Sequence, residues 1–232
     1  MKRRILRYFP IFVLLLSVVF GSFHALTIPS AAFGFRSVPT ETSRIALTFD
    51  DGPHPKLTPR ILDILDRYHV RATFFMIGVN VENYPNAARE VAARGHEIGN
   101  HTFSHHRLRG IGEERAKKEM RACADAIERV CGQRPRLFRP PEGSLDSGLV
   151  EIVCRNGYET ILWSLDTRDW DVKDENAIVR RVLSAVKPGD IILMHDFIGY
   201  HSKTPEALEI LIPKLQALGY EFVTVGELLG IG

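Results

Sequence analysis

The stretch IALTFDDGPHP, from Ile45 to Pro55, carries an apolar run into two adjacent carboxylates and then a Gly-Pro pair that breaks the chain. On an extended strand, successive side chains point to opposite faces, so Asp50 and Asp51 would not ordinarily serve one site. At the end of a strand this alternation lapses, because a turn can bring the second carboxylate back beside the first. We therefore interpret the stretch as a buried strand whose end carries a functional site.

Beyond this stretch, strands and helices alternate along the chain. The first helix is expected to open at Thr58-Pro59, where a capping residue precedes a proline at the first helical position. About seven such βα units favour a parallel sheet covered by helices. An open doubly wound sheet and a closed barrel both fit, and both bind ligands at the carboxyl ends of their strands. We expect strands at residues 44–49, 72–78, 96–100, 136–139, 159–164, 190–195 and 220–225, and helices at 58–69, 85–94, 112–132, 146–156, 175–186 and 204–219.

The N-terminal segment differs from the rest of the chain. Basic residues precede an almost unbroken apolar run from Phe9 to Ile28, a length that can span a bilayer. This pattern is typical of a secretory signal peptide or an uncleaved membrane anchor, and a small-residue cleavage site ends at Ala32. It predicts an extracytoplasmic protein, secreted or anchored to the cell membrane. We expect a signal or anchor at residues 1–32, a polar linker at 33–43 and a single domain at 44–232.

Charge and cysteine content exclude some classes of protein. The formal net charge is +2, and most of the excess lies at the extreme N-terminus, so there is no electrostatic case for nucleic-acid binding. The chain has three cysteines, Cys123, Cys131 and Cys154, and an odd number cannot form a closed disulfide framework; no C-x-x-C pair suggests a zinc site. We interpret them as small buried residues, with a bridge from Cys154 to one of the others as the alternative in an exported protein.

A histidine pair follows the third predicted strand, in HTFSHH at residues 101–106. On one turn of a helix His101 and His105 would share a face, as two imidazole ligands of a metal would. Asp51 could supply a third ligand, and such a set with open positions is typical of a catalytic divalent metal site. The alternative is that the histidines cap a helix or lie on a polar surface. The pair gains weight because it follows a strand end, as the two aspartates do.

Other titratable groups also follow predicted strands. Arg139 begins a stiff Pro-Pro loop and could pair with a carboxylate. Asp169 and Trp170 follow the strand at 159–164, and His195 ends the strand at 190–195. Taken singly, these residues could be a surface ion pair, a helix cap, a core side chain and an edge histidine. Their shared placement at one edge of one sheet indicates a site instead.

Five short motifs occur in an order that resembles one known family. They are TFDDGP at 48–53, HTFSH at 101–105, RPPEG at 139–143, DTRDW at 166–170 and LMH at 193–195. Together they resemble the polysaccharide deacetylases, the NodB-homology domains of carbohydrate esterase family 4, over residues 44–229. The resemblance implies an α/β fold, a distorted (β/α)7-type barrel in one domain. It also implies metal-dependent hydrolysis of N-acetyl groups from N-acetylglucosamine-containing polysaccharide, such as peptidoglycan or chitin-like oligomers, with release of acetate.

By this resemblance, the metal ligands are Asp51, His101 and His105. The metal would be zinc, with cobalt or nickel as alternatives that the same ligands accept. Asp50 would stay off the metal and act as the general base, which explains why two carboxylates are adjacent. His195 would protonate the departing sugar amine.

The remaining motif residues take supporting roles by the same resemblance. Arg139 would hold the general base ionised and oriented, and Asp169 would favour the charged form of the histidine acid. A backbone N–H near Glu142 would stabilise the oxyanion. Trp170 and Leu193 would wall the pocket that receives the acetyl methyl group. The family often has an aromatic residue in place of Glu142, so the surface that faces the sugar differs here.

Three other readings compete with a polysaccharide N-deacetylase. Hydrolysis of acetyl esters on xylan would use the same site. A carbohydrate-binding protein without activity would not need to keep base, ligands and acid together. A phosphatase led by adjacent aspartates would lack a glycine-rich phosphate loop and would leave the histidine pair unexplained. We expect a monomer whose partner is the N-acetylated polysaccharide substrate, with membrane association through the N-terminal segment if it is not cleaved.

Overall fold

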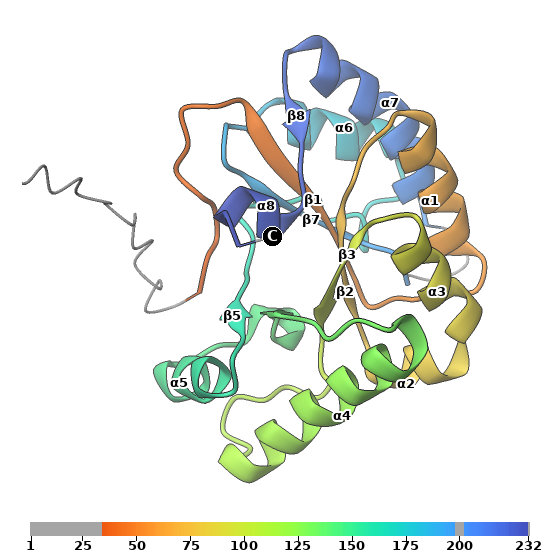
Figure 1. Ribbon diagram of the computed structural model, residues 1–232. Helices are drawn as coiled ribbons and strands as arrows, with labels where there is room; N and C mark the ends of the chain where they lie inside the picture. The colour runs from red at the N-terminus through yellow and green to blue at the C-terminus, as the bar shows by residue number, and fades with distance from the viewer. Residues whose placement is uncertain (1–33, 198–201, 232) are drawn as a thin grey trace, which may run out of the picture.

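The computed structural model describes residues 34–197 and 202–231 (Figure 1). The signal or anchor predicted for residues 1–32 lies outside these residues. Within the described ranges, none of the helices combines the length and the apolar character that a membrane crossing requires. The described chain alternates between strands and helices from β1 to α8, as the sequence pattern predicts.

In the described part of the chain, eight parallel strands form one curled sheet at the centre of the fold. β1 lies between β2 and β7, and its first two residues also pair with β8. The strand order is β5-β4-β3-β2-β1-β7-β6, which confirms the distorted (β/α)7-type barrel. Among the described residues β5 and β6 do not pair, so the barrel is open between them. The bounds are β1 Arg44–Asp50, β2 Thr73–Met76, β3 Glu97–Asn100, β4 Leu137–Phe138, β5 Glu159–Thr160, β6 Leu165–Asp166, β7 Ile191–His195 and β8 Glu221–Phe222.

Helices cover the outer side of this sheet. Figure 1 shows α1, α3, α4 and α7 around the strands, and α1 and α7 contact each other. A short 3-10 helix, η1, spans Pro141–Gly143. The α-helices are α1 Leu57–Arg67, α2 Gly78–Asn83, α3 Pro85–Ala93, α4 Glu113–Cys131, α5 Ser147–Arg155, α6 Glu175–Leu183, α7 Thr204–Ala217 and α8 Val225–Leu229.

The pleat of β1 decides which of its residues reach the site. Odd positions pack in the main core with residues of α1 and α7, namely Ile45, Leu47 and Phe49, all fully buried. Burying a side chain of this size stabilises a fold by about 1.5–3 kcal/mol. Even positions face the inside of the curl, where Ala46 packs in a second core and Thr48 and Asp50 contact Arg139. Asp50 therefore reaches the carboxyl edge of the sheet on its inner side.

Several local predictions differ from the structure. The first helix begins at Leu57, and Thr58 makes no cap; its hydroxyl group donates to Asp196 instead. The sequence reading omitted α2, β6 and α8, which are all short. The start of α8 could have been predicted from the sequence, because Thr224 and Glu227 have the spacing of a capping box and form one in the structure.

Two further predictions concern the linker and the cysteines. The segment expected to be a linker lies against the sheet at its start: Phe35 and Ser37 form bridges to Ile161 and Asp190. The domain boundaries at 33–43 and 44–232 stay a prediction. All three cysteines are free. Cys123 is buried, Cys131 is half-buried and Cys154 is exposed, so the interpretation as buried residues was wrong for Cys154.

Candidate metal and catalytic site

A cleft of about 510 Å³ opens at the carboxyl ends of the strands. Its lining comes from the ends of β1, β6 and β7 and from the segments that follow β1, β3, β4, β5 and β6, so the predicted site residues come together although they are far apart in the chain. Its lining residues are Asp50, Asp51, His101, His105, Glu142, Trp163, Asp166, Trp170, Leu193 and His195.

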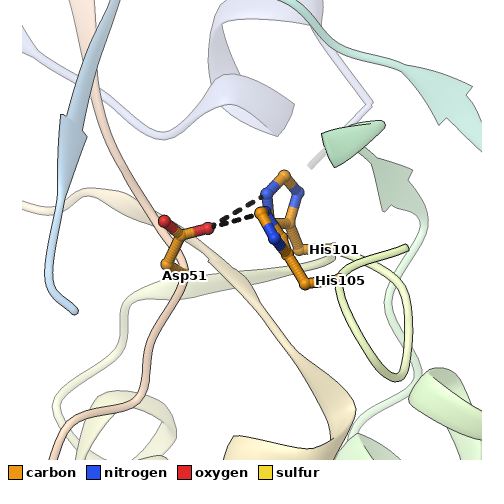
Figure 2. Close-up of side chains that lie close together, drawn as sticks. All are labelled: Asp51, His101 and His105. Carbon is orange, nitrogen blue, oxygen red and sulfur yellow. Dashed lines mark ion pairs between the residues drawn. The ribbon is translucent and has the colours of Figure 1, made fainter. Parts of the chain in front are cut away.

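Asp51 and the two histidines form a compact group (Figure 2). Asp51 Oδ1 lies 3.4 Å from His101 Nε2 and 3.1 Å from His105 Nε2. One donor atom from each residue lies within 4.8 Å of the others, a spacing at which a metal ion could be held. Asp51 has a left-handed backbone, with φ of 76°, which turns its carboxylate back toward the side of the cleft that Asp50 faces. This turn explains how adjacent aspartates reach one site.

The prediction that the histidine pair shares a helical face was wrong. Residues 101–112 form a loop, and the next helix, α4, begins at Glu113. Thr102 and His105 take left-handed conformations, with φ of 66° and 59°. These two turns, rather than helical periodicity, aim both imidazoles at Asp51.

The tautomer of His101 provides a test of whether a metal fits. Its Nδ1 lies 2.7 Å from the carbonyl oxygen of Arg139, which can only accept, so Nδ1 carries the proton. In the neutral ring the lone pair of Nε2 then faces the Asp51 carboxylate, and two acceptors face each other unless a cation or proton lies between them. A carbonyl that orients a histidine in this way is the usual partner of a metal-binding imidazole. The donor set fits a divalent metal with open positions.

The charges of the group support the same conclusion. Burial alone would raise the pKa of Asp51, but hydrogen bonds with His101 and His105 lower it well below its usual range. The hydrogen bond with Asp51 raises the pKa of His105. Asp51 is therefore ionised at neutral pH, and a metal ion would take the place of the proton that it shares with the imidazoles.

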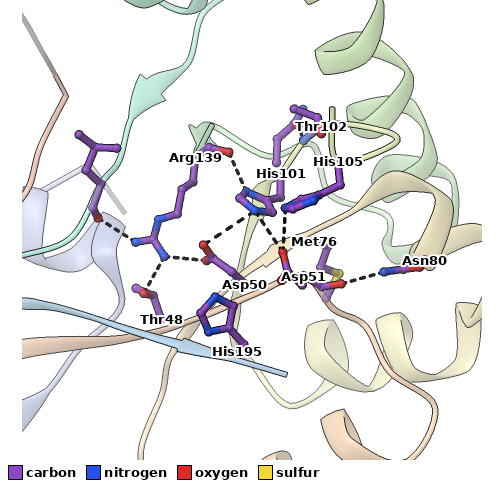
Figure 3. Close-up of polar contacts among 12 residues, drawn as sticks. Thr48, Asp50, Asp51, Met76, Asn80, His101, Thr102, His105, Arg139 and His195 are labelled. Atoms are coloured by element: carbon purple, nitrogen blue, oxygen red, sulfur yellow. Dashed lines mark hydrogen bonds and ion pairs between the residues drawn. The ribbon is translucent and has the colours of Figure 1, made fainter. Parts of the chain in front are cut away.

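The second aspartate has a different partner (Figure 3). Asp50 is 4% exposed, and its Oδ1 accepts a hydrogen bond of 2.7 Å from Nη1 of Arg139. The fully buried guanidinium also donates to Thr48 Oγ1 and to the carbonyl oxygen of Leu162, and it stacks 4.0 Å from the centre of the Phe75 ring. Burial lowers the pKa of Arg139 from its ordinary value, and Asp50 opposes that shift. Asp50 Oδ2 remains 3.8 Å from His101 Nε2, on the side that faces the candidate metal site.

His195 ends β7 on the other side of Asp50. Its Nδ1 and its backbone N–H each contact the Asp169 carboxylate at 2.8 Å. The hydroxyl group of Thr204, the first residue of α7, donates to the same carboxylate at 2.6 Å. Burial would lower the pKa of His195, but the hydrogen bond and charge of Asp169 raise it to about 9. His195 is therefore charged at neutral pH, with Nε2 left for a substrate.

The residues predicted to face the sugar form the walls of the cleft. Leu193 is 3% exposed on β7, and Trp170 is 53% exposed at the rim. Glu142 has a left-handed backbone and makes an ion pair with Arg107. The sequence reading gave no role to Trp163, which also lines the cleft. The feature of the sequence that could have indicated this role is the position of Trp163 at the end of a predicted strand.

Asp196 is a further residue that the sequence reading left without a role. It follows His195 directly and is 1% exposed. Burial raises the pKa of its carboxyl group to about 7, despite the hydrogen bond from Thr58.

The fold and the cleft together define an α/β barrel protein with a candidate divalent metal centre at the carboxyl ends of its strands. The family model of the polysaccharide deacetylases matches residues 37–161, which is more than half of the chain. A peptidoglycan-N-acetylglucosamine deacetylase of Bacillus cereus (strain ATCC 14579) is 41% identical over 194 residues, which cover 83% of this chain and 91% of that protein. The chain belongs to the polysaccharide deacetylase family.

Solved structures agree with this membership. The Bc1960 peptidoglycan N-acetylglucosamine deacetylase matches with a TM-score of 0.81 and 36% identity, over 83% of this chain and 91% of the other. A family 4 acetyl xylan esterase from Clostridium thermocellum, solved with a cobalt ion, matches with a TM-score of 0.76 and 36% identity, over 81% and 91%. The family and the fold that the sequence motifs indicated are thus confirmed.

Proposed function

We propose that the protein is a zinc-dependent hydrolase that removes N-acetyl groups from N-acetylglucosamine-containing polysaccharide and releases acetate. The observation that carries this proposal is the meeting, in one cleft, of a metal-type triad, a buried carboxylate beside an arginine, and a charged histidine. The similarity to peptidoglycan-N-acetylglucosamine deacetylases supports the choice of substrate.

Asp51, His101 and His105 would hold the metal. Two imidazoles and one carboxylate suit zinc, although the cobalt ion in the related esterase shows that a relative accepts another divalent metal. A divalent metal in such a site supplies a water of lowered pKa and polarises a carbonyl group. The chain itself would orient the acetamide and manage the protons.

Asp50 would take the proton of the attacking water. Arg139 holds one of its oxygens at 2.7 Å, so the other oxygen is oriented toward the triad, where a nucleophilic water would lie. The buried guanidinium places a positive charge beside this carboxylate and fixes its orientation. A base placed in this way contributes about 10²- to 10⁴-fold to a rate.

His195 would protonate the sugar amine as it leaves. Asp169 holds its Nδ1, and the raised pKa of about 9 keeps the imidazole charged before the reaction. Leu193 and Trp170 would enclose the acetyl methyl group, and the backbone N–H of Glu142 would stabilise the oxyanion. The Glu142–Arg107 ion pair places charge at the rim, so this part of the site would favour polar rather than aromatic contact with the neighbouring sugar.

Acetate release tests the proposal directly. The purified protein, with added zinc, should release acetate from peptidoglycan or chitin oligomers. The second candidate, acetyl ester hydrolysis, is favoured by the similarity to the acetyl xylan esterase, and acetylated xylan in the same panel tests it. No release from any of the three substrates by zinc-loaded protein would contradict both.

The location of the protein is also a proposal. The basic and apolar start of the chain supports export, with the domain secreted or held at the membrane by residues 1–32 and acting as a monomer on the polymer. A reporter fused after Gly232 should be active only outside the cytoplasmic membrane. A full-length protein found entirely in the cytosol would contradict export.

A further inference from the structure

Asp196 lies behind the turn that carries Asp51 and takes no part in the proton transfers above. Its backbone N–H donates to the carbonyl oxygen of Asp50 at 3.1 Å. Its carboxyl group is almost fully buried, and Oδ2 accepts a hydrogen bond of 2.5 Å from the hydroxyl group of Thr58. Within the described residues its Oδ1 has no hydrogen-bond partner. Burying a carboxyl group with so few hydrogen-bond partners is unfavourable for stability. The place of this carboxyl group therefore depends on what it packs against.

That packing is against Gly52, the residue after Asp51. A Cβ atom built on Gly52 would lie closer than 3.0 Å to both oxygens and the carbon of the Asp196 carboxyl group. Real Cβ atoms do not approach so closely, so only glycine fits there. The φ of Gly52 is not positive, so its need for glycine comes from Asp196 rather than from its own backbone.

The opposite side of the turn is held by α2. Asn80 Nδ2 donates to the carbonyl oxygen of Asp51 at 2.7 Å, as Figure 3 shows, and the N–H of Ile77 donates to the carbonyl oxygen of Gly52 at 2.9 Å. Thr58 in turn accepts a hydrogen bond of 2.7 Å from the N–H of His54, in the loop that leaves the turn. The turn is thus enclosed between α2 on one side and Asp196 with Thr58 on the other.

We propose that Asp196, together with Thr58, is a positioning residue that holds the Asp50–Gly52 turn so that the Asp51 carboxylate faces the two imidazoles. A left-handed conformation at a residue other than glycine persists only where the surroundings enforce it. The carboxyl group of Asp196 provides that enforcement from the β7 side. The inference rests on the metal site of the proposed function, and it concerns how this chain prepares that site.

Zinc titration of the metal-free protein tests the proposal without relying on turnover. Asp196→Ala should weaken zinc binding by about 10- to 100-fold, the range for residues that orient metal ligands. Thr58→Val should weaken it in the same direction. Asp196→Asn and Thr58→Ser keep shape and hydrogen bonding, so they should retain most of the affinity. A matched control is Asp190→Ala, which removes a buried carboxylate at the opposite end of β7 and should leave zinc affinity unchanged.

A double-mutant cycle between Gly52 and Asp196 gives a second measure of the same contact. If Asp196→Ala folds poorly, Thr58→Val tests the proposal alone, and zinc affinity in that variant equal to that of the unaltered protein would overturn it. Gly52→Ala alone should weaken zinc binding, because its methyl group meets the Asp196 carboxyl group. In the Asp196→Ala background the same methyl group has room, so the second change should cost much less than it does alone. Circular dichroism and thermal melting confirm that each variant compared is folded.

Two other results would overturn the proposal. One is zinc affinity in Asp196→Ala equal to that of the unaltered protein. The other is a Gly52→Ala effect that is the same with and without Asp196. Failure of the unaltered protein to bind zinc would instead reject the metal site of the proposed function, so the two failures are distinguishable.

Discussion

Asp50 and Asp51 are neighbours in the chain, yet within one cleft the carboxylate of Asp50 pairs most closely with Arg139 and that of Asp51 with His105. Asp50 accepts from Arg139 at 2.7 Å, whereas Asp51 lies 3.1 Å from His105. The left-handed turn at Asp51 makes this possible, because it cancels the alternation that a strand would impose. A carboxylate kept off the metal site but beside it is the arrangement that a general base requires.

Loss of the histidine pair should abolish metal binding. The variant with both His101→Ala and His105→Ala leaves only Asp51 of the triad, and one carboxylate does not hold zinc tightly. Isothermal titration with zinc should show no stoichiometric site, while the circular dichroism spectrum stays that of a folded α/β protein. His106→Ala is the matched control, because its imidazole contacts Ser104 rather than Asp51. Unchanged zinc content in the double variant would contradict the ligand assignment.

Removal of the arginine should destabilise the fold through Asp50. Arg139→Met leaves a buried carboxylate without its cation, and breaking a buried pair in this way costs about 3–5 kcal/mol of unfolding free energy. Adding Asp50→Asn removes the uncompensated charge and should recover part of that loss. Urea unfolding of the two single variants and the double variant measures the coupling. Additive losses would show that the two side chains are not energetically paired.

Substrates with different leaving groups should distinguish the proton roles that we propose for Asp50 and His195. Asp50→Asn should keep zinc and lose about 10²- to 10⁴-fold in rate on both the natural amide and an activated phenyl ester. His195→Ala should lose a comparable factor on the amide, whose amine leaves poorly without a proton. On the ester its loss should be small, since a phenolate needs little help. Equal losses of His195→Ala on both substrates would remove this residue from the role of acid.

The pH dependence of the rate should report His195. Its pKa is raised to about 9, so the charged form that would protonate the amine is present below that pH and is lost as the pH rises through it. Asp169→Asn removes the partner that raises this pKa, so the alkaline limb of the pH–rate profile should move to lower pH. Steady-state rates between neutral pH and pH 10 measure the shift. An alkaline limb that stays in place would mean that another group sets it.

The alternating pattern of the sequence predicted a parallel sheet with a site at its carboxyl edge, and the resemblance of the five motifs to the family indicated a barrel rather than an open sheet. Apolar runs that end in polar residues mark the carboxyl edge of a parallel sheet, and Asp50, Arg139 and His195 all lie at such ends. The sequence did not predict the left-handed conformations of Asp51, Thr102 and His105. Such conformations are uncommon for any residue except glycine. Aspartate and histidine adopt them more often than most residues, but that weak preference does not say at which position tertiary contacts will hold one.

The role of Asp196 was hidden for a related reason. In the sequence it is one more polar residue after a strand, and its contact with Gly52 joins segments more than a hundred residues apart. Trp163 was hidden differently, because a tryptophan at a strand end is as much a core residue as a wall of a cleft. Its exposure to the cleft follows from the curl of the sheet.

Arg139 contacts His101 through its main chain and Asp50 through its side chain. Its carbonyl oxygen accepts from His101, while its guanidinium donates to Asp50. The carbonyl belongs to the main chain and survives any substitution at this position, whereas the guanidinium does not. A family member that has lost the arginine side chain, and with it the support of the base, would still present an oriented imidazole to a metal. Metal content and turnover can therefore differ among relatives, so metal binding by a relative does not by itself show that it is active.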